Sequence, residues 1–199
     1  MDANAIQLTS DAFRKRLEDA FKARSDAGDH LFDGHKVHVG ALDDDEAQDA
    51  LAVLFLHRVA TNADLRNSLH AVQSNDPATL EIHEGGLPLD LHYLLTAGNS
   101  KTGGEAPALR ILGLAMQVLN DQPNLVGNLV SGETVRVTLD PVSNEEMGRI
   151  WSLFPTVNYR TSVAYLASPV WIDPATPRVE GPPVVEEPHR FWQKARTGT

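Results

Sequence analysis

The stretch 87-LPLDLHYLLT-96 decides how the fold is read. Apolar residues occupy every odd position from Leu87 to Leu95, while Asp90 and His92 fall on the other parity. Alternation with a period of two is typical of a strand that buries one face and exposes the other. The segment therefore predicts a strand, in which Leu94 interrupts the polar outer face.

Three other segments carry apolar residues three or four positions apart, which is the period of a helix. They predict helices over residues 10–24, 107–120 and 143–154. The apolar stripe of the second segment is so wide that we expect this helix to be mostly buried. Ser10 is expected to cap the first helix, and Ser143 with Glu146 forms a capping box for the third.

Further alternating segments predict strands over residues 36–42, 134–139 and 159–172, the last bent or placed at an edge by Pro169. Residues 49–60 are apolar on both parities, which fits a buried strand or a short buried helix, and their β-branched and aromatic content favours the strand. Residues 65–84 are expected to form a loop with a helical turn near residues 64–69.

The order of these elements predicts an α+β domain over residues 1–172, with one mixed, largely antiparallel sheet and about three helices packed against it. The expected core consists of twelve apolar side chains. They are Phe13, Leu17, Phe21, Phe55, Leu89, Leu91, Leu112, Met116, Val137, Ile150, Trp151 and Val163.

Residues 173–199 differ in character from the rest, because five prolines fall before residue 189. They predict an extended proline-rich arm that ends near two aromatic residues, Phe191 and Trp192. Either the arm is an untethered tail, or it docks these aromatics on a neighbouring subunit or on another protein of the same assembly. In the second case its basic flank could face an acidic patch such as residues 43–46.

Composition restricts the function classes. The chain of 199 residues has 17 Lys and Arg against 27 Asp and Glu, a net charge of −10, which argues against nucleic acid or an anionic membrane as the main partner. It has no cysteine, so disulfides and thiolate chemistry are excluded. Its longest apolar run, Leu51 to Leu56, is far shorter than a membrane span, and its first residues do not resemble a secretory signal. These features predict a soluble, cytoplasmic domain.

Histidines offer the first candidates for chemistry. His30, His35 and His38 lie close in sequence to Asp29 and Asp33, but not at the fixed spacing that metal sites on regular elements use. A solvated turn is therefore favoured over a metal site. Asp90 and His92 share one face of a strand, and we expect an outward-facing or hydrogen-bonded pair.

The acidic run Asp43, Asp44, Asp45 and Glu46 lacks the spacing and the glycine of a calcium-binding loop. We expect a solvated loop or a contact for a basic partner. Nucleophile elbows and phosphate-binding glycine loops are also missing from the sequence. The sequence thus predicts no catalytic residue, no cofactor and no metal, which favours an interaction protein over an enzyme.

A set of motifs points to a family. The segment 87-LPLDLHYLLT-96 is followed by 111-ILGLAMQVLN-120, then by Ser143-Asn-Glu-Glu146 and Trp151, and then by 159-YRTSVAY-165. This order resembles the tube-cap, or tube-terminator, family of extracellular contractile injection systems. The resemblance covers roughly residues 8–173, so the arm is its least transferable part.

The resemblance implies a fold similar to the tail terminators of contractile phages and a structural role. Such proteins form a six-fold ring on the distal end of the inner tube, stop its growth and can meet the last layer of sheath. Assembly is expected in the cytoplasm, with release as part of a particle. Two alternatives stay open: a sheath-end or baseplate adaptor of the same particle, and a small soluble enzyme using Asp90 and His92 or the histidines His30, His35 and His38.

Overall fold

The structure is a computed structural model that describes residues 3–73, 80–83, 85–98, 104–174 and 179–181. Its elements are, in chain order, helix α1 (Ala5–Asp26), a 3-10 turn (His30–Phe32), strand β1 (Val37–Val39), a second 3-10 turn (Asp45–Asp49), β2 (Ala52–Thr61), β3 (His70–Gln73), β4 (Leu80–His83), β5 (Leu87–Ala97), α2 (Glu105–Asp121), β6 (Asn124–Val126), a third 3-10 turn (Asn128–Val130), β7 (Thr134–Leu139), α3 (Asn144–Trp151), β8 (Ser162–Ile172) and β9 (Val179–Gly181).

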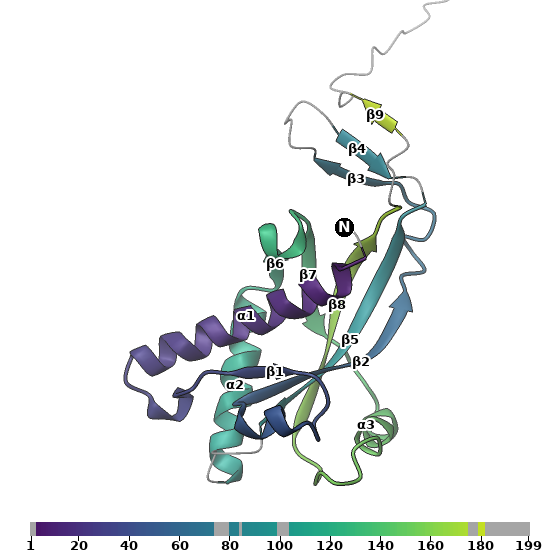
Figure 1. The fold of residues 1–199 in the computed structure, drawn as a ribbon. Helices are drawn as coiled ribbons and strands as arrows, with labels where there is room; N and C mark the ends of the chain where they lie inside the picture. Colours follow the sequence, from purple (N-terminus) through teal and green to yellow (C-terminus); the bar gives the residue numbers. More distant parts are fainter. Residues whose placement is uncertain (1–2, 74–79, 84, 99–103, 175–178, 182–199) are drawn as a thin grey trace, which may run out of the picture.

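Six strands form the main sheet in the order β1-β2-β5-β8-β7-β6. Only β1 runs parallel to its neighbour, and the other four pairings are antiparallel. The two longest strands, β5 and β8, lie side by side at the centre of the sheet (Figure 1). The predicted α+β class and the mixed, largely antiparallel sheet are confirmed.

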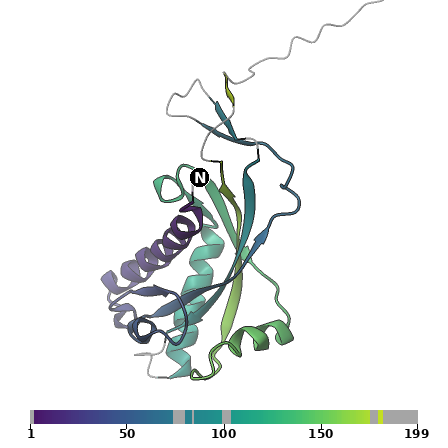
Figure 2. The ribbon, with the colours of Figure 1, turned by 45° about the vertical axis from the view of Figure 1, so that its right-hand side comes forward.

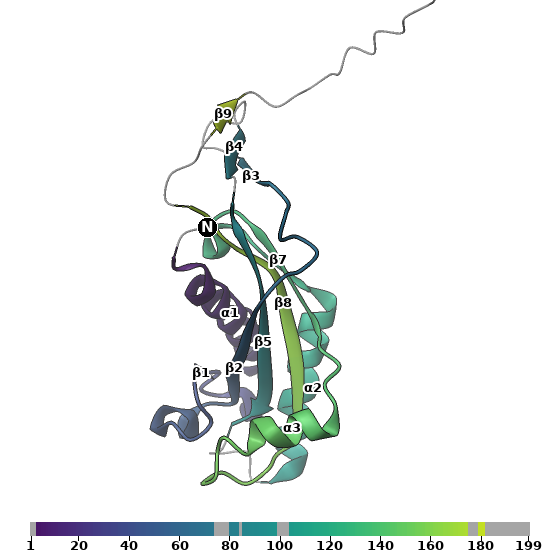
Figure 3. The ribbon, with the colours of Figure 1, turned by 90° about the vertical axis from the view of Figure 1, so that its right-hand side faces the viewer.

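Helices cover both faces of this sheet. The odd positions of β5 pack with α1 and α2 in the larger core, where Phe13, Tyr93 and Ile111 are fully buried. Leu94 points to the other face and joins a smaller cluster around Trp151 of α3. Figure 3 shows α1 and α3 on opposite sides of the sheet. Leu94 therefore interrupts the polar face because a helix covers it.

The predicted core is largely confirmed. Nine of its members are buried, while Phe55, Met116 and Val163 are partly buried and pack against the two clusters. Among the buried side chains that sequence reasoning omitted, Tyr93 is the largest that is fully buried. Its ring packs edge-on against Phe13 with the centroids 5.4 Å apart.

The start of the first helix differs from the prediction. The helix α1 begins at Ala5, so Ser10 lies inside it and does not cap it. The Ser10 hydroxyl lies 2.9 Å from the Ile6 carbonyl, to which it can donate, and 2.8 Å from the Tyr93 hydroxyl. Ser10, which the sequence predicts as a helix cap, is thus the buried polar partner of Tyr93. The capping role of Ser143 is confirmed, because its Oγ accepts the Glu146 N–H at 3.1 Å.

The last long strand, β8, is shorter than predicted and begins at Ser162, which leaves Tyr159 exposed before it. Pro169 lies inside β8, not at an edge, and follows a cis peptide bond. The pairing of β8 with β5 shifts register beside it, between Leu89 and Leu91. Proline is tolerated within a sheet at such an irregularity.

A second, smaller sheet lies at one end of the molecule, beyond the ends of β5 and β8 (Figures 1 and 2). Its strand order is β3-β4-β9, and both pairings are antiparallel. The prediction that residues 65–84 form a loop is wrong, because β3 and β4 lie within them. β9 belongs to the predicted arm yet pairs with β4, so three arm residues are part of this sheet.

Candidate functional site

The histidines nearest in sequence do not converge in space. His30 pairs with Asp33 at 3.2 Å on the surface, where 87% of its side chain is exposed. His38 turns to Asp44 instead, with Nε2 2.8 Å from the carboxylate. Among the residues that the structure describes, the only potential metal-binding group lies elsewhere, so His30, His35 and His38 do not form one site.

The acidic run is divided between internal and external contacts. Asp44 accepts the Ala41 N–H at 3.0 Å as well as the contact from His38, so its carboxylate holds the local loop. Asp43, Asp45 and Glu46 are exposed, and Asp45 and Glu46 begin a 3-10 turn. These three remain candidates for contact with a basic surface.

Asp90 and His92 each have a partner of their own. The Asp90 carboxylate accepts hydrogen bonds from Ser168 Oγ at 2.6 Å and from the Asn62 amide at 2.9 Å. His92 Nδ1 lies 2.6 Å from Asp140 Oδ2. These contacts tie β5 to its neighbouring segments, and they give the pair a structural explanation that needs no shared chemistry.

His57 stands beside this group, with its ring centroid 6.1 Å from that of His92. Burial lowers the pKa of His57, and the neighbouring imidazole of His92 lowers it further, against the opposing carboxylates of Asp140 and Glu146. His57 is therefore held in the neutral form around neutral pH. Asp90 and His92 are thus held by separate hydrogen bonds, and the buried Nε2 of His57 has no hydrogen-bond partner among the described residues.

Sequence reasoning missed the most compact polar cluster of the described residues, which consists of His70, Glu133 and Asp173. Their side chains are only 7%, 14% and 5% exposed. His70 Nδ1 lies 2.7 Å from Asp173, and Nε2 lies 3.0 Å from Glu133. The partners are 103 and 63 residues away in sequence, so no local pattern could have indicated the cluster.

The donor atoms of this cluster lie within 4.8 Å of one another, which is compact enough for a metal ion. However, each ring nitrogen of His70 already faces a carboxylate. A metal ion would need one of these nitrogens without its proton and would displace that contact. The arrangement fits an imidazolium between two carboxylates. Burial by itself would lower the pKa of His70, but the hydrogen bonds to Glu133 and Asp173 outweigh burial and raise it.

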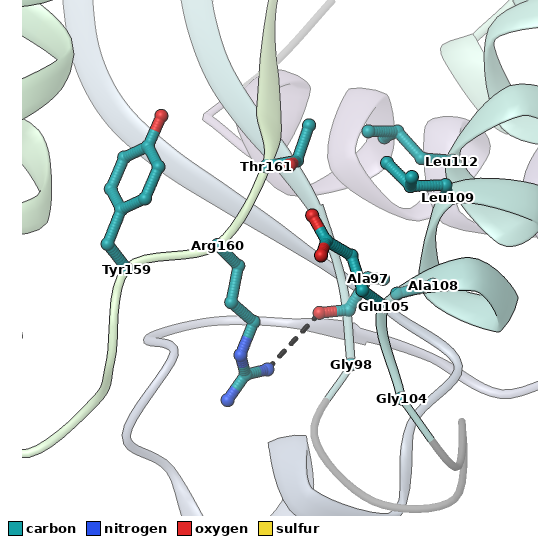
Figure 4. Close-up of a pocket in the computed structure, with 10 residues that line it drawn as sticks. All are labelled: Ala97, Gly98, Gly104, Glu105, Ala108, Leu109, Leu112, Tyr159, Arg160 and Thr161. Atoms are coloured by element: carbon teal, nitrogen blue, oxygen red, sulfur yellow. Dashed lines mark hydrogen bonds between the residues drawn. The ribbon is translucent and has the colours of Figure 1, made fainter.

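A cavity of about 520 Å³ opens between the start of α2, the end of β5 and the start of β8. Leu109, Leu112 and Ala108 give it an apolar wall, and Arg160 and Glu105 supply its charges (Figure 4). The Arg160 guanidinium donates to the Ala97 carbonyl at 3.3 Å. The cavity can hold an apolar group with a polar end, and Glu105 is the carboxylate in its lining.

The edge of the main sheet formed by β6 and β7 carries three exposed apolar side chains. Val126 of β6, Leu129 and Leu139 of β7 are 54%, 43% and 57% exposed. A second hollow of about 510 Å³ lies between α2 and β7, and Leu139 is part of its lining. An exposed apolar side chain beside a hollow is a candidate protein contact. Phe191 and Trp192, the predicted aromatic anchors, lie outside the described residues. Among the described helices, none has the length and apolar character of a membrane span.

Comparison with known proteins gives one match over most of the chain. The profile of the Pvc16 N-terminal domain family matches residues 10–186. Comparison with curated proteins found no match.

Two solved structures are similar to the chain, both at 18% sequence identity. One is the sheath/tube terminator of the extracellular contractile injection system PVC in its extended state, with a TM-score of 0.47 over 81% of this chain and 57% of that chain. The other is the tube-terminating cap of the anti-feeding prophage, with a TM-score of 0.45 over 69% of this chain and 48% of that chain. The chain thus spans about half the length of these structures.

Proposed function

The chain belongs to the Pvc16 N-terminal domain family, and we propose that it is a structural protein that caps the inner tube of a contractile injection system and stops its growth. The observation that carries this proposal is the family match over residues 10–186. The two similar structures are named as a sheath/tube terminator and a tube-terminating cap, which is consistent with the role. Its partners are then the inner tube protein and, at the same end, the sheath.

A structural role also agrees with how the polar residues are used. Asp90 and His92, which an enzyme would need, are each engaged by neighbouring strands and loops. Residues whose hydrogen bonds tie the fold together are poor candidates for binding and releasing a substrate. We therefore propose that the protein is not an enzyme and that its function lies in its surfaces.

The two edges of the main sheet support the proposal of a ring. One edge carries the exposed Val126, Leu129 and Leu139. At the opposite edge β1 pairs only with Ala52–Leu54, so among the described strands none lies along the outer side of residues 55–61. Figure 1 shows this part of β2 on the right-hand border of the sheet. Unequal edges suit a heterologous contact, which repeats from copy to copy and closes as a ring.

The proposed ring has six copies, each placing its β6–β7 edge against the open edge of β2 in the next copy. Leu139→Asp places a charge on the first edge and should reduce ring assembly about tenfold or more, since burying an unpaired charge is costly. Leu153→Asp is the matched control, because Leu153 is 60% exposed on the segment that follows α3. Light scattering gives the assembly state of both variants.

We further propose that the chain divides into a cap domain, residues 1–172, and an arm, residues 173–199, that reaches a neighbouring subunit or the sheath. Phe191 and Trp192 would be its anchors, and the exposed Asp43, Asp45 and Glu46 of a neighbour could face its basic residues. Because β9 pairs with β4, a clean test deletes residues 182–199 and keeps Val179–Gly181. The truncated protein should stay folded and lose occupancy on tube ends.

The decisive experiment assembles the purified tube protein with and without this chain and images the particles by negative staining. The proposal predicts tubes of limited length that end in a six-fold ring. Uncapped tubes of unchanged length would overturn it. Binding only to sheath or baseplate components would favour the adaptor role. The proposed cytoplasmic assembly is tested by recovering capped particles from lysed cells before release.

A further inference from the structure

His70 occupies the first position of β3, where the chain enters the small sheet. Glu133 lies in the turn before β7, and Asp173 follows directly after the end of β8. The three residues thus come from the small sheet and from two segments of the main sheet. Their contact joins the small sheet to the main sheet through buried charged groups.

The geometry favours the charged form of His70. Its Nδ1 lies 2.7 Å from Asp173 Oδ1, and its Nε2 lies 3.2 Å from Glu133 Oε2, within hydrogen-bonding distance on both sides. Ionised carboxylates only accept hydrogen bonds, so both ring nitrogens must donate, and a ring with two N–H groups is an imidazolium. A neutral ring would leave one carboxylate facing a bare nitrogen.

Trp171 holds the imidazolium in place. The two rings stack with their centroids 4.4 Å apart and their planes 7° apart. An aromatic face attracts a cation, which favours the charged ring further. Gly86 allows this packing, because a Cβ at that position would come within 2.9 Å of Asp173 Oδ1 and 3.2 Å of the Trp171 ring. His83, the partner of His70 across β3 and β4, lies on the remaining side with its centroid 6.2 Å away.

We propose that His70 is a pH-dependent clamp that fastens the small sheet to the main sheet through Glu133 and Asp173. The charged groups that face it among the described residues are these two carboxylates, with His83 as the second titratable ring. The clamp also sets where the chain leaves the main sheet toward β9, since Asp173 lies at that exit. The proposal does not depend on the cap function.

The sign of the pH effect follows from the direction of the shift. The contacts to both carboxylates raise the pKa of His70 above its usual value near 6.5, although burial opposes them. A raised pKa means that the clamp is fully formed below pH 6.5 and is lost as pH rises through the pKa of the folded protein. Alkaline conditions should therefore release the small sheet while the apolar core stays folded.

Hydrogen exchange of the full chain tests the clamp, because it reports local opening. The readout is the protection of amides in β3 and β4 relative to amides of β5, measured in wild type, His70→Gln and Glu133→Gln. Gln at position 70 is neutral and keeps a polar side chain. The control is His30→Gln, which removes an exposed His–Asp pair in a different part of the chain.

We expect His70→Gln to lower the protection of β3 and β4 about tenfold at pH 6, as is typical for losing a hydrogen bond between charged groups, and to leave β5 unchanged. Wild type should lose the same protection as pH rises, and an NMR titration of the His70 ring should have its midpoint above 6.5. Glu133→Gln should lower that midpoint.

Equal protection of β3 and β4 in wild type and His70→Gln would overturn the clamp, as would a His70 midpoint at or below 6.5. Protection that follows added Zn²⁺ or a chelator, and not pH, would assign the cluster to a metal and overturn it equally. If His70→Gln fails to fold, loss of β5 protection reveals this, and the Glu133→Gln titration decides.

Discussion

The two sheets of this protein are held by different forces. The six-stranded sheet is fastened by apolar side chains on both faces, with Phe13, Tyr93 and Leu94 fully buried. The small sheet has strands of three or four residues, and among the described side chains the charged group around His70, which stacks on Trp171, is a buried contact that joins it to the rest. Apolar packing responds little to pH, whereas a buried imidazolium responds strongly. The small sheet is therefore the part of the fold that solvent conditions can move.

The largest expected effect comes from removing a buried side chain from the apolar core of the main sheet. Phe13→Ala removes a fully buried ring that packs edge-on against Tyr93 and Tyr165, with centroids 5.4 Å and 6.0 Å away. We expect the free energy of unfolding to fall by about 3–5 kcal/mol, since the site is too tightly packed to collapse fully. Chemical denaturation measures it. Leu153→Ala, at a 60% exposed position, should change it by less than about 0.5 kcal/mol.

The same difference explains what the sequence could predict. Period-two alternation around Leu89 and Leu91 indicated β5, and the wide stripe of α2 indicated a buried helix, because burial on one face imposes a repeating pattern. The strands β3 and β4 left no such pattern. They are stabilised by pairing with each other and by His70, whose partners are 63 and 103 residues away.

The candidate sites were less predictable than the fold for a related reason. Closeness in sequence suggested His30, His35 and His38, but His30 in a 3-10 turn and His38 in β1 face separate carboxylates. Ser10 had the residue type of a cap, yet its use depends on Tyr93, which is 83 residues away. The partners of Ser10 and His70 lie far away in sequence, and a local pattern does not contain such partners.

A second prediction concerns the junction of the main sheet. Gly98 lies beside the backbone of Ala50 and Leu51, and its N–H donates to the Leu51 carbonyl at 2.7 Å. A Cβ at this position would collide with the Ala50 carbonyl oxygen, which cannot move without the backbone that leads into β2. Gly98→Ala should cost about 1–3 kcal/mol, as overpacking does. Gly113→Ala is the matched control, since no atom lies within 4 Å of its Cβ, and it should stabilise α2 by about 0.5–1 kcal/mol.

The corresponding change near the small sheet is Gly86→Ala. A Cβ at Gly86 would meet side chains, which can move, whereas a Cβ at Gly98 would meet backbone atoms. The added methyl would press on Asp173 and Trp171, which together position His70. We expect a local effect, in which β3 and β4 exchange faster while the midpoint of global unfolding moves by less than it does in Gly98→Ala. An equal loss of protection in β5 would mean that the two sheets open as one unit.

The smallest expected effect concerns two histidines, one in each sheet, whose pKa values are shifted in opposite directions. Burial lowers the pKa of His57 on the main sheet, and the neighbouring His92 lowers it further, whereas the carboxylates around His70 raise the pKa of that residue. His57 therefore contributes its full stability above pH 6.5, and this contribution is lost as pH falls through 6.5 toward the pKa of the folded protein. His70 behaves in the opposite way.

His57→Gln should accordingly flatten the fall in the free energy of unfolding on acidification, by less than about 1 kcal/mol because His57 is only half-buried and solvent screens it. Denaturation curves at pH 7.5 and 5.5 for His57→Gln, His30→Gln and wild type measure the difference. A single NMR titration gives both signs together, with the midpoint of His57 below 6.5 and that of His70 above it. If the midpoint of His57 lay above that of His70, the proposed causes of the two pKa shifts would be wrong.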